Sequence, residues 1–136
     1  MTKRLLSLPL LLVLSYGMKK PLNQKEIAHI ASNCSKIGLV ALESLRQKES
    51  SRLTTTAISA AVKVFELLGS RAMVVQDSKD QFEVEMEVEK ICEDLLVAED
   101  ELYDLEKVLP RSYMPNEIIR NISRELASSR RFLDCG

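Results

Sequence analysis

The stretch that decides the fold runs from Gln81 to Pro110 and reads QFEVEMEVEKICEDLLVAEDELYDLEKVLP. In its first part, residues 82–89, apolar residues alternate with glutamates, as in a half-buried β-strand. From Val84 to Leu109, however, apolar residues recur at alternating spacings of four and three residues. One face of a helix has this spacing over nearly four heptads, and a strand does not. The stretch therefore predicts a helix of roughly 30 residues, about 45 Å long at 1.5 Å per residue.

The ends of this helix carry their own signals. Ser78, followed three residues later by Gln81, has the pattern of a capping box. Pro110 cannot continue a helix, and Lys107 in the last turn suits the negative end of the helix dipole. We therefore expect the helix to run from Ser78 to Leu109.

Similar apolar stripes and helix-capping residues predict three further helices. Gly69 lies inside the second of them, where it is expected to kink or end the helix. The alternative to separate second and third helices is one continuous helix from Thr56 to Leu109. The three helices are expected from Asn23, capped with Glu26, to about Lys48; from one of Thr54, Thr55 and Thr56 to about Gln76; and from Asn116, behind Pro115, onward.

The predicted connections are short, and the chain has only four glycines and four prolines. Short links favour antiparallel neighbours. We therefore predict an all-α fold: an antiparallel three- or four-helix bundle, or a helical hairpin, with one long acidic helix of coiled-coil type. Residues 19–136 are expected to form a single helical domain behind an apolar N-terminal segment, residues 1–18.

Charge is divided unevenly along the chain, although the net charge is −1. Residues 77–107 carry thirteen acids and three bases, a net charge of −10, and the flanking segments are net basic. Such a division indicates that the acidic segment lies against basic segments of this chain or of a partner. It argues against nucleic acid as a main ligand, and no small-molecule substrate is expected.

The heptad stripe is the most specific signal for function. Six of the eight positions that flank it are acidic, so a parallel self-dimer would place like charges opposite each other. A basic helix would suit it better, either a partner's or one of this chain's own. The candidate bases within the chain are Lys25, Lys36, Arg46 and Lys48 on the first helix and Arg120, Arg124, Arg130 and Arg131 on the last. The leading prediction is a non-enzymatic structural or adaptor subunit that binds another helical protein. Its expected interface consists of Val88, Ile91, Leu95, Leu102 and Leu105, with Glu87, Asp94, Glu99 and Glu101 setting partner choice.

Signals for catalysis are weak. His29 is the only histidine, and the Glu26-x-x-His29 pair lacks the second copy that carboxylate-bridged metal bundles use. The four glycines are isolated, so no glycine-rich phosphate loop is predicted. We therefore expect no catalytic, cofactor-binding or metal-binding residues, and a metal-dependent helical-bundle enzyme is a remote alternative.

The first eighteen residues resemble a targeting sequence. Lys3 and Arg4 precede the apolar run Leu5–Leu14, and small residues follow at Ser15 and Gly17, which is the layout of a secretory signal. An organellar presequence and a retained arm that contacts a membrane through the apolar run are the alternatives. The second functional hypothesis is thus an exported or membrane-associated helical bundle. If residues 1–17 are not a signal, the chain is expected to be organellar or cytoplasmic.

The three cysteines are Cys34, Cys92 and Cys135, an odd number that cannot form a closed disulfide framework. We expect free or partly buried thiols, with a Cys34–Cys92 bridge as the alternative. Two Asn-x-Ser sequons begin at Asn33 and Asn121. Because both fall on predicted helices, the sequence alone favours chance occurrence.

Overall fold

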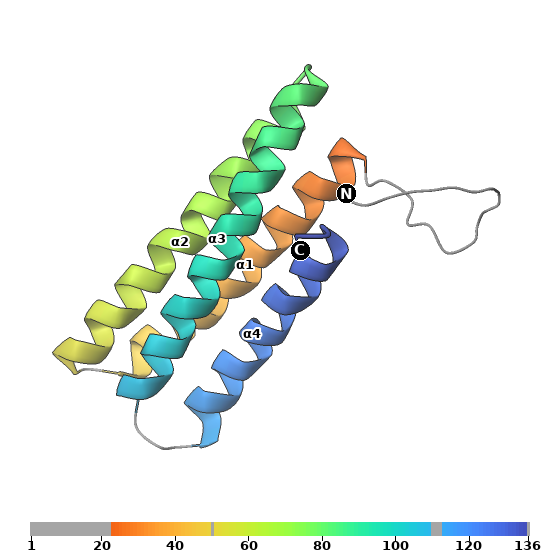
Figure 1. The fold of residues 1–136 in the computed structure, drawn as a ribbon. Helices are drawn as coiled ribbons and strands as arrows, with labels where there is room; N and C mark the ends of the chain where they lie inside the picture. Colours follow the sequence, from red (N-terminus) through yellow and green to blue (C-terminus); the bar gives the residue numbers. More distant parts are fainter. Residues whose placement is uncertain (1–22, 50, 110–112, 136) are drawn as a thin grey trace.

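The computed structural model describes residues 23–49, 51–109 and 113–135 of the 136-residue chain. These residues form four α-helices: α1 (Gln24–Lys48), α2 (Arg52–Asp77), α3 (Gln81–Val108) and α4 (Tyr113–Phe132). Consecutive helices run in opposite directions, and α4 closes the bundle by packing against α1 (Figure 1). The predicted all-α bundle is therefore confirmed, with four helices. Because α1 and α3 make few contacts, they occupy opposite corners of the bundle.

The ends of α1 and α2 differ in how well the sequence predicts them. The capping box at Asn23 is confirmed, because its side chain accepts a hydrogen bond from the Glu26 amide while the Glu26 carboxylate accepts from the Asn23 amide. The prediction that a threonine caps α2 is wrong. The hydroxyls of Thr55 and Thr56 instead donate to carbonyls one turn earlier, so both residues lie inside the helix, and the cap position is Ser51. Gly69 neither ends α2 nor interrupts it.

The turn between α2 and α3 corrects two predictions. Ser78 does not cap α3. Its hydroxyl donates to the Val74 carbonyl and its amide to the Val75 carbonyl, so it terminates α2. Asp80 caps α3 by accepting a hydrogen bond from the Phe82 amide. The chain therefore turns at residues 78–80, and the continuous helix considered as an alternative does not form. The last helix also differs, since α4 begins at Tyr113, three residues before Asn116.

Small residues let α1 and α2 approach closely. A Cβ added at Gly38 would lie 2.3 Å from Cδ1 of the fully buried Phe65, so this position requires glycine in the present packing. The Ser35 hydroxyl donates a 2.7 Å hydrogen bond to the Phe65 carbonyl across the same contact. The Gln24 side-chain amide donates to the carbonyls of Val75, Gln76 and Ser78, which ties the start of α1 to the end of α2.

All four helices contribute to one hydrophobic core. Its largest fully buried side chains come from the inward stripes. They belong to α1 (Leu42, Leu45), α2 (Ile58, Phe65, Leu68, Val75), α3 (Ile91, Leu95, Leu102, Leu105) and α4 (Ile119, Leu126). None of the described helices is long and apolar enough to cross a membrane. The N-terminal segment to which the targeting and membrane hypotheses refer lies outside the described residues.

Candidate protein-binding surface

The apolar side of the predicted interface lies inside the chain's own core. Ile91, Leu95, Leu102 and Leu105 are all fully buried, and Val88 is partly buried against them. The covering helices are α2 and α4 on either side of α3. In this fold, these residues hold the bundle together, so the solvent-exposed surface of α3 lies on its other side.

Two of the predicted partner-selecting acids also pair within the chain. Glu87 and Asp94 are each only 8% exposed. Arg71 of α2 lies between them, hydrogen-bonded to the Asp94 carboxylate and 3.7 Å from the Glu87 carboxylate. Lys90 approaches Glu87 at 3.5 Å from one turn along α3. The sequence predicted bases on the first and last helices and did not predict Arg71 of α2. The seven-residue spacing of Glu87 and Asp94 could have indicated it, because this spacing places both acids on one edge of α3, beside α2.

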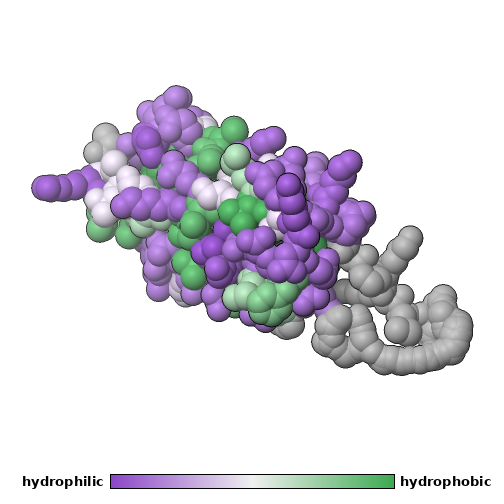
Figure 2. Space-filling view, turned by 90° about the horizontal axis from the view of Figure 1, so that it is seen from above, coloured by the Kyte–Doolittle hydropathy of each residue, from purple (hydrophilic) through white to green (hydrophobic). Residues whose placement is uncertain are grey.

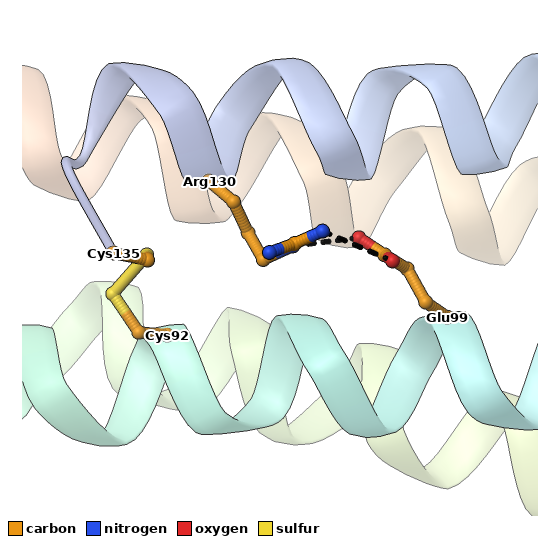
Figure 3. Close-up of a disulfide and its surroundings, with 4 residues drawn as sticks. All are labelled: Cys92, Glu99, Arg130 and Cys135. Carbon is orange, nitrogen blue, oxygen red and sulfur yellow. Dashed lines mark hydrogen bonds and ion pairs between the residues drawn. A yellow bond between two sulfur atoms is a disulfide. The ribbon is translucent and has the colours of Figure 1, made fainter.

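The other two predicted partner-selecting acids, Glu99 and Glu101, lie in different surroundings. Glu99 accepts hydrogen bonds from Nε and Nη2 of Arg130, at 2.8 and 3.3 Å (Figure 3). This pair joins α3 to α4 and uses a base that the sequence did predict. Glu101 is partly exposed on α3. The ion pairs show that part of the acidic charge of α3 is compensated inside the molecule.

A second apolar stripe lies on the solvent side of α3, opposite the core. Phe82, Met86, Leu96 and Tyr103 are 65%, 44%, 50% and 61% exposed. Together with the exposed Glu89, Glu93, Asp100 and Lys107, they recur at spacings of four and three residues. We call these eight residues the outer row. It also explains the alternation at the start of the helix, because residues two apart on a helix point about 200° apart. Val84 therefore enters the core while its alternating neighbours Phe82 and Met86 face solvent.

The outer row combines apolar and acidic character. Of its four charged members, three are acids, and its one base, Lys107, lies 4.3 Å from the centre of the Tyr103 ring. Further exposed acids, Glu83, Glu85 and Asp104, lie on the same helix. Figure 2 shows one face of the molecule on which hydrophobic side chains lie among hydrophilic ones. An apolar stripe with this charge is suited to a partner that supplies apolar side chains and bases.

A hollow continues the outer row at its C-terminal end. It has a volume of about 550 Å³ and is lined by residues of α3 and α4, namely Tyr103, Glu106, Lys107, Leu109, Asn116 and Arg120. The buried Oδ1 atom of Asn116 accepts no hydrogen bond from the described residues. Two residues of the outer row thus also line a concave surface between helices.

The cysteines are paired differently from either expectation. Cys92 of α3 and Cys135, just after α4, form a disulfide, with their Cα atoms 5.6 Å apart (Figure 3). Cys34 is the free thiol, buried at 3% exposure, with its sulfur 2.9 Å from the Ser129 hydroxyl of α4. The expected free thiols at Cys92 and Cys135 and the alternative Cys34–Cys92 bridge are wrong, whereas the expected free thiol at Cys34 is confirmed. Cys34 and Cys92 lie on α1 and α3, which occupy opposite corners of the bundle, whereas Cys135 lies beside α3.

Among the described residues, no three His, Cys, Asp or Glu side chains gather where they would hold a metal ion. His29 lies on the exposed side of α1, near Ile30 and Phe132.

Comparison of the chain with protein-family models, with curated proteins and with solved structures gave no match. The fold defines the class of the protein, an all-α four-helix bundle closed by a disulfide.

Proposed function

We propose that this chain is a non-enzymatic structural or adaptor protein that binds another helical protein through the outer row of α3. One observation carries the proposal. Four large apolar side chains lie exposed in heptad register on a helix whose inner side is already filled by its own core. Exposed apolar residues in a regular stripe mark an interaction surface more often than isolated ones do.

The register and the charge of the outer row suggest the kind of partner. A spacing of four and three residues matches the side chains of a second helix. The acids Glu89, Glu93 and Asp100 favour bases on that helix. Two copies meeting in parallel through this row would place these acids opposite one another, which is unfavourable. A basic amphipathic helix of a different protein is therefore the proposed occupant.

The test compares two double variants in native cells. Met86→Glu with Leu96→Glu places two charges in the outer row. Val40→Glu with Leu53→Glu makes the same chemical change at residues that are 72% and 65% exposed on α1 and α2. The first pair is expected to reduce recovery of one stoichiometric partner by about tenfold or more, a loss of ~1.4 kcal/mol. The second pair is expected to leave recovery unchanged. Equal recovery with both pairs, at equal thermal stability, would rule out the outer row as the interface.

A second proposal, that the bundle is exported, is favoured by the Cys92–Cys135 disulfide. Disulfides persist mainly in oxidising compartments such as the secretory pathway or the periplasm. The basic start and apolar run of residues 3–14 have the layout of a cleavable signal. We expect the native protein to lack this segment and to weigh two hydrogens less than its reduced form. An intact mass that includes the segment, with three free thiols, would contradict export.

A further inference from the structure

We propose that Asn33 and Asn121 are acceptor sites for N-linked glycans, an inference that rests on the export proposed above. The chain has four asparagines, and only these two begin an Asn-x-Ser sequon. Both sequons lie on helices, as predicted, but both asparagines are exposed on the solvent sides of α1 and α4. A bulky, hydrated glycan requires such a position.

The local contacts leave the reacting atoms accessible. Asn121 uses Oδ1 to accept a 2.6 Å hydrogen bond from Arg124, one turn further along α4. Its Nδ2 atom, to which a glycan is attached, has no role in that bond. Asn33 lies on the exposed side of α1 with His29 and Lys36 one turn away on either side. A glycan at either position displaces no core residue.

The timing of modification follows from burial. In the first sequon, Ser35 is 5% exposed, and its hydroxyl donates to the Phe65 carbonyl. A transferase that must contact this hydroxyl therefore acts before α1 packs against α2.

The sugar comes from a lipid-linked oligosaccharide diphosphate. The Nδ2–C1 bond forms, the C1–O bond to the diphosphate breaks, the lipid diphosphate leaves, and the amide proton passes to the transferase. No oxidation or reduction is involved.

Both sites lie away from the outer row of α3. Asn33 is on α1, at the corner of the bundle opposite α3. Asn121 and Arg130 are nine residues apart on α4, which places them on opposite sides of that helix. Because Arg130 faces α3, Asn121 faces away from it. Glycans at both sites would thus leave the proposed protein-binding surface uncovered.

The experiment is translation of the full chain in the presence of endoplasmic-reticulum microsomes. A second form carries an established cleavable signal ahead of the full chain, so that its translocation does not depend on residues 1–22. We expect two stepwise mobility shifts in the protease-protected product, both removed by peptide-N-glycosidase. Asn33→Gln and Asn121→Gln should each lose one shift, the double variant both, and Ser123→Ala the same shift as Asn121→Gln.

The outcomes separate the inference from the export proposal. A protected product of the second form without any shift overturns the inference, as does a shift that survives in the double variant. If only one of Asn33→Gln and Asn121→Gln loses a shift, the inference is overturned for the asparagine whose substitution has no effect. If only the second form enters the microsomes, export fails and modification of the native protein fails with it. The second form then still shows whether the two asparagines are acceptors.

Discussion

Leu95 and Leu96 are neighbours in the chain that lie in opposite environments. Leu95 is fully buried between the helices, whereas Leu96 is half exposed in the outer row. We expect Leu95→Ala to lower the free energy of unfolding by about 3 kcal/mol, because it leaves a cavity in the core. The matched change Leu96→Ala is expected to alter it by less than ~0.5 kcal/mol. Denaturant unfolding of both variants measures the difference. Similar losses of unfolding free energy would mean that α3 does not have one buried and one exposed side.

At Cys34, burial is the largest cause of a raised thiol pKa. The nearby Glu125 charge also raises the pKa, and the hydrogen bond with Ser129 opposes the shift. Because the folded-state pKa lies above the unfolded value, the neutral thiol stabilises the fold fully below the ordinary pKa of 9.0. That stabilisation is lost as the pH rises through the higher folded-state pKa. We expect the free energy of unfolding to fall more steeply above pH 9 in the native chain than in Cys34→Ala. Parallel curves would contradict this assignment.

At the scale of the elements, Arg71 joins α2 to α3 through two acids whose side chains are only 11% and 12% exposed. Removing one partner of a buried ion pair leaves the other charge uncompensated. Because Arg71 is itself 23% exposed, we expect Arg71→Met to cost about 2–3 kcal/mol, less than the ~3–5 kcal/mol of a fully buried pair.

The comparison variant is Arg130→Met, which breaks the more exposed pair with Glu99. Its expected cost is about 1 kcal/mol or less. Thermal and denaturant unfolding of both variants give the ranking. A larger loss for Arg130→Met would show that the Arg71 cluster contributes little to the packing of α2 on α3.

The disulfide fixes the end of α4 to α3 and closes a loop with a sequence separation of 43. Constraining a loop of this length in the unfolded chain stabilises the folded state by about 4 kcal/mol in the chain-entropy model. We expect Cys92→Ala with Cys135→Ala to lower the free energy of unfolding by about that amount. A reductant should destabilise the native chain and leave this variant unaffected. Equal sensitivity of both proteins to reductant would show that the bridge does not form.

The helices were predictable where a stripe of apolar residues and a cap agreed. Asn23 is such a case, because both hydrogen bonds of the Asn23–Glu26 pair form within one turn of the chain. Ser78 shows the limit. Its sequence context fits a cap for α3, but its hydroxyl donates to the Val74 carbonyl at the end of α2. That competition depends on where the chain turns, which three-residue patterns do not specify.

For the whole molecule, the all-α bundle was predictable from periodicity, but the arrangement of its helices was not. The pairing of Cys92 with Cys135 and the position of Arg71 between two acids depend on which helices are neighbours. For the same reason, the sequence predicted the inner stripe of α3 as the interface. An apolar heptad stripe looks the same whether it is covered by the same chain or by another. The outer row is as long as the inner stripe, but half of its positions are charged, so it becomes visible only once exposure is known.

For the whole molecule, we propose that α3 packs into its own bundle on one side and binds a separate helical protein on the other. Site-specific photo-crosslinking in native cells tests this most directly, with the crosslinking residue placed at position 96 on α3 and, as the control, at position 40 on α1. The account predicts one discrete crosslinked protein, different from this chain, from position 96 and none from position 40. No crosslink from position 96, a crosslink to a second copy of this chain, or the same product from both positions would contradict it.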